Sequence, residues 1–276
     1  MNPALKRQLR RWVPPAVVSH INAWRGVETV LRGRYDSWEM ASTHASGYDS
    51  RHILEHVLQA SRQVRDGQAA YERDSVLFER VEYAFPLLAV LLRAALEQSG
   101  ALSVLDFGGA LGSSYRECRG FLGTQVQPLR WAVVEQPSFV EAGRREMQND
   151  ELVFFGSLQE AARGQRIDVL LFSAVLQYLP DPYRVLDEAL QIGPRWLVLD
   201  RTIVSTRSSD LVHVQCVPDS IYPASYPVWS LSRERLLKHI PTGFEMISEH
   251  SSLPFPALQT IDAEFKGFIF KNTHPR

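Results

Sequence analysis

The sequence has little cysteine, almost no net charge and no long apolar run. Its 276 residues include two cysteines, Cys118 and Cys216, which fit a reducing compartment and lack a metal-binding spacing. The formal net charge is −1, so no global field attracts nucleic acid. No apolar run reaches the roughly 20 residues of a membrane span, and no signal core follows the first basic residues. These absences predict a cytoplasmic protein without a metal requirement or a nucleic-acid partner.

Positive charge is concentrated in the first 34 residues, although the whole chain is nearly neutral. This stretch has a single acid, Glu28, and its basic residues are Lys6, Arg7, Arg10, Arg11, Arg25, Arg32 and Arg34. Apolar residues such as Trp12 are interleaved with them, and a basic amphipathic segment can lie on an anionic membrane surface. The pattern equally fits a helical arm packed on the domain. Peripheral membrane contact therefore stays open as an alternative.

The first hundred residues are predicted to form a helical extension. Apolar residues recur at helical spacing over 51–64 and 83–98, with capping signals at the helix ends. From residue 101 the pattern changes to short apolar runs that alternate with amphipathic segments, over 102–106, 130–135, 152–155, 167–173 and 196–200. Such alternation predicts parallel strands joined by helical crossovers, and thus an α/β domain over 101–276.

The end of the chain predicts two further strands. A short helix over 232–240 precedes strands over 244–249 and 265–271, which makes seven strands in total. Between the fifth strand and this helix lies the proline-containing stretch 201–231. Loops longer than about 15 residues in a compact domain are usually functional, so this stretch is predicted to be a loop that serves as a substrate lid.

Three glycines follow the first predicted strand, where an open α/β sheet forms its nucleotide crevice. In this run Asp106 precedes Gly108, Gly109 and Gly112. Glycine lets the backbone approach a ligand closely, and the helix that follows presents its N-terminus. A dinucleotide fingerprint has G-x-G-x-x-G without a preceding acid. The acid therefore argues against a dinucleotide.

The motif resembles the first motif of class I S-adenosylmethionine (SAM) methyltransferases. Ala110 stands at the usual middle glycine, and Gly109 is an additional residue. The resemblance implies a Rossmann-like, seven-stranded, mostly parallel sheet, here with an α-helical N-terminal extension, and SAM as the cofactor. Asp106 is then expected to meet the amino group of the ligand or to orient the turn.

Polar residues at the ends of the next strands complete the predicted cofactor site. Glu135, with Gln136 beside it, ends the second strand, and an acid there can accept hydrogen bonds from both ribose hydroxyls. Ser157 follows the third strand, where the adenine lies in this fold, and it fits equally well as the cap of a helix. Ser173 ends the fourth strand and is the last residue of the set.

The residues after the fourth and fifth strands are predicted to face the substrate. Gln177 stands where many small-molecule methyltransferases have a histidine, and glutamine can position a substrate but cannot act as a base. Tyr178 is either a wall of the pocket or a weak base. Asp200 and Arg201 end the fifth strand, either as a substrate-facing pair or as an ion pair that fixes the lid.

The stretch 201–231 supplies further candidates for acceptor binding. Tyr222, Tyr226 and Trp229 lie in a segment with two prolines, and rigid aromatic planes suit stacking on a sugar ring or covering a pocket. The alternative is a lid that buries its aromatic residues against the sheet. His213 is a candidate general base near neutral pH, although a single histidine in a loop is often incidental.

Several short runs spread over residues 35–271 carry a more specific resemblance. They are 46–49 (SGYD), 67–74 (GQAAYERD), 108–115 (GGALGSSY), 134–137 (VEQP), 175–179 (VLQYL), 200–202 (DRT), 222–227 (YPASYP) and 265–268 (FKGF). Together they resemble a family of bacterial SAM-dependent methyltransferases encoded near surface-polysaccharide genes. In that family Gly109 and Gln177 are ordinary traits.

The resemblance identifies the fold and the cofactor much more closely than the substrate, and the favoured acceptor is a sugar hydroxyl of a surface glycan or its precursor, which would be O-methylated. The candidate bases are then Asp200, Tyr178 and His213, in that order. Two alternatives stay open. The chain is either a methyltransferase for another small metabolite or natural-product intermediate, or an inactive SAM-fold partner protein in a glycan-assembly complex.

Overall fold

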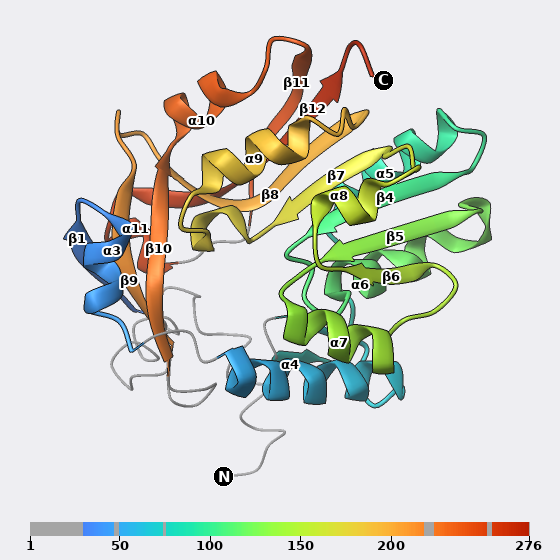
Figure 1. Cartoon of the computed structure of the whole chain (residues 1–276), viewed down its shortest axis with the longest axis horizontal. Helices are drawn as coiled ribbons and strands as arrows, with labels where there is room; N and C mark the ends of the chain where they lie inside the picture. Colours follow the sequence, from blue (N-terminus) through green and yellow to red (C-terminus); the bar gives the residue numbers. More distant parts are fainter. Residues whose placement is uncertain (1–29, 47–49, 74–75, 218–223, 253–255, 276) are drawn as a thin grey trace, which may run out of the picture.

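The apolar runs beyond residue 101 form neighbouring strands in the computed structural model, which describes residues 30–46, 50–73, 76–217, 224–252 and 256–275. The parallel strands are β4 (Leu102–Phe107), β5 (Leu129–Val134), β6 (Leu152–Phe155), β7 (Val169–Ser173) and β8 (Trp196–Ser205). They lie in the order β6-β5-β4-β7-β8, and β12 (Ala263–Asn272) pairs antiparallel with β8 and with β11 (Phe244–Ser251). This order, with the last strand inserted antiparallel, confirms the predicted class I methyltransferase fold (Figure 1).

Helices cover both faces of this sheet, which is why its strands are apolar along most of their length. One face packs against α5 (Phe85–Leu96), α6 (Ser113–Leu122) and α7 (Pro137–Glu146). The other packs against α8 (Leu158–Ala162), α9 (Pro182–Leu190) and α10 (Arg233–His239). Successive residues of a strand point to opposite faces, so Val104 belongs to the first core and Leu105 to the second.

The N-terminal extension is helical only in part. Its helices α3 (Trp38–Thr43) and α4 (Ser50–Arg65) are accompanied by β1 (Val30–Tyr35) and by a hairpin of β2 (Tyr71–Arg73) and β3 (Val76–Phe78). Helix α4 covers the predicted 51–64 and packs its buried Ile53 and Val57 into the first core. Arg62 of α4 also donates to Glu146 of α7 at 2.6 and 2.8 Å. The basic segment lies largely outside the described residues, and the domain boundary near residue 100 stays a prediction.

The prediction of a loop over 201–231 is wrong for the residues that the structure describes. Strand β8 continues to Ser205, and β9 (Leu211–Val217) and β10 (Ala224–Ser232) follow as an antiparallel pair. Pro227 suggested a loop, but β10 pairs with β8 only at Leu231 and Ser232. At Pro227 the strand therefore borders a single neighbour, β9, and a missing N–H is tolerated there.

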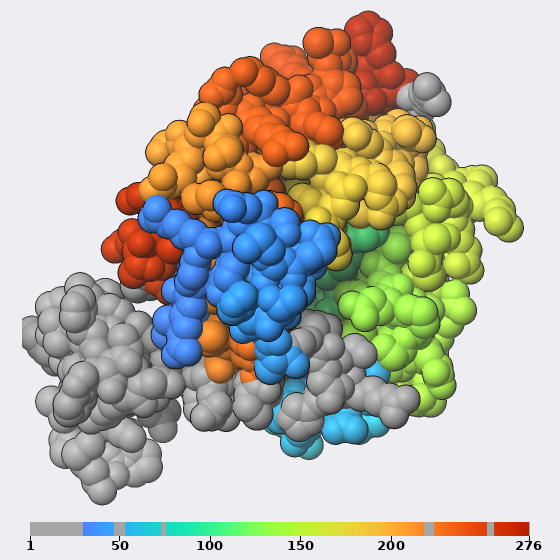
Figure 2. Space-filling model, turned by 60° about the vertical axis from the view of Figure 1, so that its left-hand side comes forward, coloured from blue at the N-terminus to red at the C-terminus, as the bar shows by residue number. Residues whose placement is uncertain are grey.

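Strands β1, β9 and β10 with helix α3 form a unit that we call the wing. Strand β1 pairs with the outer edge of β9, and α3 packs its buried Ala41 against Val212 and Val214 of β9. The wing projects from the far end of β8, away from β4–β6 (Figure 1). In the space-filling view a hollow separates the blue part of the wing from the yellow-green core, and its floor is green, the colour of residues just past 100 (Figure 2). Among the described residues, no helix is long and apolar enough to span a membrane.

Candidate active site

The Gly turn between β4 and α6 is shaped by close packing beneath it. Gly108 and Gly112 have φ of 72° and 89°, a region that favours glycine. Gly109 is required for a different reason, because a Cβ there would lie 2.5 Å from the Oδ2 atom of Asp106. Ala110 has φ of 50°, the backbone conformation expected of the glycine that it replaces. The additional glycine and the alanine thus both have local structural explanations.

Asp106 lies completely buried under this turn. Its Oδ2 atom accepts a hydrogen bond from the indole N–H of Trp131 at 3.0 Å, and its Oδ1 atom has no partner among the described residues. The pKa of Asp106 is raised to about 7. Burial is the main cause, Glu135 and Asp200 add to it, and Trp131 and Arg201 oppose it. The structure therefore shows Asp106 supporting the turn, and its contact with a ligand stays a prediction.

Glu135 joins the end of β5 to the Gly turn. One carboxylate oxygen accepts from the N–H of Ala110 at 3.3 Å and the other from the N–H of Gln136 at 2.7 Å. Burial raises the pKa of Glu135, and these two hydrogen bonds oppose the effect. Gln136 itself is exposed and is the N-cap residue of α7, but its side chain makes no capping hydrogen bond. Glu135 is thus half-buried at the turn, where the sequence predicts a ribose contact.

Ser157 forms the predicted helix cap. Its Oγ atom accepts from the N–H of Glu160 at 3.2 Å, and the Glu160 carboxylate accepts from the N–H of Gly156 at 3.3 Å. Ser157 follows the carboxyl end of β6, on the same edge of the sheet as Glu135, and this reciprocal pair of hydrogen bonds begins α8 there. The adenine contact stays a prediction.

Ser173, Asp200 and Arg201 form a hydrogen-bonded group where β7 ends, beside the middle of β8. Ser173 and Asp200 are register partners, and the Ser173 hydroxyl donates to Oδ2 of Asp200 at 2.7 Å. The Arg201 guanidinium lies 3.2 Å from the same oxygen and donates to the Ser173 hydroxyl at 2.9 Å. The predicted ion pair is therefore present, and the Asp200 side chain keeps 14% of its surface exposed.

A β-bulge in β8 holds this group. Thr202 pairs with Lys266 and Leu199 with Phe268, so Asp200 and Arg201 together face one residue of β12. Arg201 has φ of 49°, an uncommon value for a residue with a side chain. The Gln177 side chain, which is completely buried, donates to the carbonyl oxygen of Arg201 at 3.1 Å. The sequence predicts substrate binding for Gln177, whereas the structure places its amide against the backbone of the bulge.

Three of the five non-glycine residues with positive φ among the described residues lie at this edge of the sheet. Ala110 follows β4, Ala174 follows β7 with φ of 54°, and Arg201 lies in the bulge of β8. The N–H of Ala174 also donates to the carbonyl oxygen of Asp200 at 2.9 Å. Non-glycine residues with positive φ cost about 1–3 kcal/mol each and cluster at functional sites. Their common location supports this edge as the active site.

The wing brings two of the predicted aromatic residues together and separates a third. Tyr178, in a 3-10 turn over Leu176–Tyr178, donates to the side-chain oxygen of Gln215, and the Gln215 amide donates to the Tyr226 hydroxyl, at 3.1 and 3.3 Å. The two tyrosine rings meet edge to face at 5.6 Å. Trp229 lies on the other face of β10 and stacks on Trp38 of α3. Tyr222 lies outside the described residues.

His213 is a buried strand residue and not a loop residue as expected. It lies in β9, two residues from Gln215, and its Nδ1 atom is 2.7 Å from the carbonyl oxygen of Gly33. Because a carbonyl can only accept, Nδ1 carries the proton and Nε2 carries the lone pair. Nε2 has no partner among the described residues. Burial lowers the pKa of His213, so the ring is neutral at pH 7.

Two polar residues of this edge were missed by the sequence analysis. Gln215 connects the two tyrosines, and the alternating pattern of 211–217 would have revealed it as a strand residue facing Tyr178. Glu72 of β2 accepts a hydrogen bond from Ser113, the first residue of α6. No spacing signals this contact, because 41 residues separate the partners.

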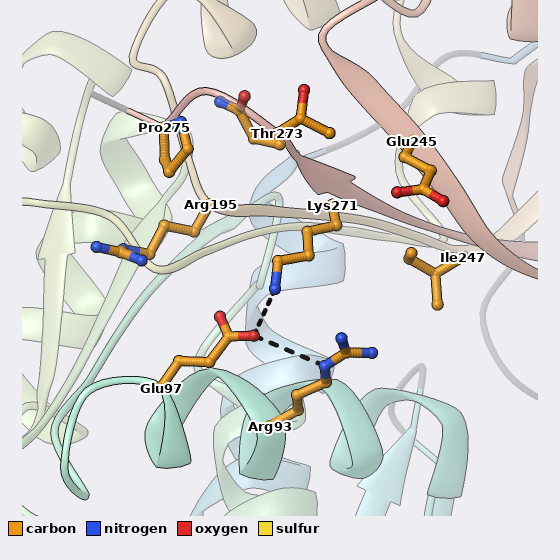
Figure 3. A pocket seen from close by; sticks show the side chains of 9 residues that line it. Arg93, Glu97, Arg195, Glu245, Ile247, Lys271, Thr273 and Pro275 are labelled. Carbon is orange, nitrogen blue, oxygen red and sulfur yellow. Dashed lines mark hydrogen bonds and ion pairs between the residues drawn. The ribbon is translucent and has the colours of Figure 1, made fainter.

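A pocket of about 810 Å³ lies at the opposite edge of the sheet, where β8 begins and β12 ends (Figure 3). Its charged residues already compensate one another, since Glu97 lies 2.6 Å from Nζ of Lys271 and 3.6 Å from Nε of Arg93. The strained and polar residues described above do not line it. No cluster of three or more potential metal ligands occurs among the described residues.

Comparisons with known proteins add a fold-level likeness. No protein-family model and no curated protein matches the sequence. The N-terminal domain of EvdMO1, solved with SAH and D-fucose, is 17% identical with a TM-score of 0.49, over 83% of this chain and 98% of that chain. The Burkholderia thailandensis 1,6-didemethyltoxoflavin-N1-methyltransferase, bound to its substrate and S-adenosylhomocysteine, is 15% identical with a TM-score of 0.44, over 83% and 93%. At these values the likeness assigns no activity, and the function has to be argued from the site.

Proposed function

We propose that this protein is a SAM-dependent methyltransferase, and the charge around the Gly turn is the observation that carries the proposal. Two carboxylates, those of Glu135 and Asp200, lie close enough to Asp106 to raise its pKa. The Arg201 guanidinium is a nearby cation and lowers it. An edge with this excess of carboxylates repels a pyrophosphate and attracts a cation. SAM carries a sulfonium and an ammonium group against one carboxylate, so it suits this edge better than a dinucleotide does.

The chain's own groups also fit SAM sterically and by hydrogen bonding. Gly109 packs directly on Asp106, where a Cβ atom would clash, and the Oδ1 atom of that buried acid still lacks a donor among the described residues. Glu135 accepts one N–H at each oxygen, and a carboxylate can accept about four hydrogen bonds, so it can also accept both ribose hydroxyls. Gln136, Ser157 and Ser173 border the same edge, and we assign them to the cofactor as well.

When bound, SAM supplies an electrophilic methyl group on its sulfonium. The chain must then hold the acceptor oxygen in line with that methyl group and remove the hydroxyl proton. Asp200 is our first choice of base, because its carboxylate is partly exposed and Ser173 and Arg201 fix its position. Tyr178 follows, and His213 comes third because its neutral ring is completely buried in the wing.

We further propose a sugar hydroxyl of a glycan or its precursor as the acceptor. Aromatic rings pack on sugar rings, and a primary amide both donates to and accepts from sugar hydroxyls. Tyr178, Tyr226 and Gln215 supply these groups within one hydrogen-bonded unit of the wing and its neighbouring turn. We also propose that Arg201, which is paired with Asp200 and Ser173, contacts a carboxylate or phosphate on the same acceptor. A cytoplasmic location and a role of β9 and β10 in covering the acceptor are part of this proposal, and peripheral membrane contact stays an open alternative.

Methyl transfer from labelled SAM into a panel of glycans and nucleotide sugars, detected by mass, tests the assignment. The full-length protein is expected to label at least one sugar, and Asp200→Asn is expected to abolish transfer while it still binds SAM. Asp150→Asn is the matched control, because Asp150 is exposed in the turn before β6, at the opposite edge of the sheet. Full transfer by Asp200→Asn would exclude Asp200 as the base. Transfer to no member of the panel by a protein that binds SAM would contradict the sugar acceptor and favour a methyltransferase of another small molecule.

A further inference from the structure

Glu72 is a buried acid at the beginning of α6, contributed by a distant part of the chain. It lies in β2, it is 2% exposed, and its carboxylate accepts a hydrogen bond from the hydroxyl of Ser113. Ser113 is the first residue of α6 and directly follows Gly112 of the Gly turn. The acid thus belongs to the N-terminal extension but lies beside the turn of the core domain.

The hairpin that carries Glu72 is fastened to α6 by a second buried acid. Glu117 of α6 accepts from the Tyr71 hydroxyl at 3.1 Å and from the N–H of Ala84 at 3.0 Å. Arg116, between the two contacts, directs its guanidinium to the sulfur of Met147 at 3.0 Å. Glu72 is therefore held in a fixed position and is not a mobile surface acid.

A carboxylate is an informative group at this position. The first residues of a helix favour negative charge, and dinucleotide-binding folds place a pyrophosphate there. In α6 the N-cap is Gly112, whose position provides no side-chain acceptor. Glu72 supplies negative charge at this helix N-terminus from the protein itself. Burial lowers the pKa of Arg116, and the nearby Glu72 carboxylate opposes that effect.

A second observation points to a cationic ligand at the same turn. The Oδ1 atom of Asp106 is buried, lacks a hydrogen-bond partner among the described residues, and is directed at the turn, since it lies 3.1 Å from the Cβ position of Gly109. The Gly turn is therefore flanked by carboxylates. Glu135 contacts it at Ala110, in its middle, and Glu72 contacts it at Ser113, just past its end.

We propose that Glu72 is a specificity residue that binds the ammonium group at the amino-acid end of SAM. This inference rests on the proposed function. The ribose and the ammonium group lie in different parts of the SAM molecule. Glu135 contacts the Gly turn at Ala110 and is proposed to bind the ribose, whereas Glu72 contacts Ser113 and is proposed to bind the ammonium group. A carboxylate that binds an ammonium forms a charge-assisted hydrogen bond, which is stronger than a bond between neutral groups.

The test compares three ligands that differ only in their amino-acid end or methyl group. Calorimetry of the full-length protein with SAM, S-adenosylhomocysteine and 5′-methylthioadenosine separates the ammonium contact from adenosine binding, because the last compound has no amino-acid end. Glu72→Gln keeps an acceptor for Ser113 and removes only the charge. We expect this variant to bind SAM and S-adenosylhomocysteine about 10- to 100-fold more weakly. Its affinity for 5′-methylthioadenosine should stay within about twofold.

Two further variants keep the result interpretable. Glu79→Gln removes the same charge from an exposed residue just past β3 and should leave all three affinities unchanged. Glu72→Asp keeps the charge but shortens the side chain, and it should weaken SAM more than 5′-methylthioadenosine even if Glu72→Gln does not fold. Equal losses for all three ligands would overturn the inference, since Glu72 would then only support the turn. Unchanged SAM affinity would overturn it as well. If the unmodified protein binds none of the ligands, the proposed function fails first.

Discussion

The packing of the Gly turn on Asp106 gives a prediction whose size follows from the structure. In Gly109→Ala the new Cβ atom would lie 2.5 Å from Oδ2 and 2.7 Å from Cγ of Asp106. Asp106 is completely buried and bonded to Trp131, so it has little room to move. Overpacking of this kind and a weakened hydrogen bond together should lower the free energy of unfolding by about 2–4 kcal/mol. The melting temperature should fall by roughly 4–16 °C.

Urea and thermal unfolding of the purified variant measure this effect, and SAM calorimetry measures its consequence for binding. The control is Gly120→Ala in α6, where the new Cβ atom would meet only the Tyr83 hydroxyl at 4.0 Å. Alanine is the better helix former, so this control should raise the free energy of unfolding by about 0.5–1 kcal/mol. If Gly109→Ala matched the unmodified protein in stability and in SAM affinity, the turn could not lie against Asp106 as described.

Two more predictions concern the buried acid itself. The pKa of Asp106 is raised from 3.8 to about 7, so the folded state holds a proton that the unfolded state releases between these values. The acid therefore contributes stability at low pH that is lost as the pH rises to about 7, by at most about 1.4 kcal/mol per pH unit. Asp106→Asn should remove this slope in urea titrations from pH 4 to 8, and an identical slope in both proteins would contradict the assignment. Trp131→Phe removes the indole N–H that donates to Oδ2 of Asp106, and it should lower the free energy of unfolding by about 1–3 kcal/mol. An unchanged urea midpoint would argue against this hydrogen bond.

The core of the fold could be predicted because its signal is local. The run 152–155 is apolar, bounded by polar residues, and forms β6 with the same limits. Helix α4 extends the predicted 51–64 by one residue at each end. In such segments burial on one or both faces determines both the sequence pattern and the structure. The wing is not predicted from the sequence because a long stretch with several prolines favours a loop, whereas Pro227 lies where β10 has one neighbour.

The candidate site was predictable where residues follow strand ends and not where they meet through the fold. Glu135 directly follows β5, and Asp200 pairs with Ser173, the last residue of β7, so the alternation alone brings them to one edge of the parallel strands. The contact between Glu72 and Ser113 depends on how the hairpin docks on α6, which no short motif encodes. The bulge that Gln177 holds depends likewise on the register between β8 and β12. Contacts that depend on tertiary packing or on the register between distant strands could therefore not be predicted from the sequence.

The central claim is that the acidic Gly turn binds SAM in preference to a dinucleotide. Calorimetric titration of the full-length protein with SAM and, separately, with NAD⁺ tests it most directly. The account predicts saturable binding of one SAM per chain, weakened by Glu135→Ala, and no measurable binding of NAD⁺. Absence of SAM binding at tens of micromolar protein, or tighter binding of NAD⁺, would contradict it.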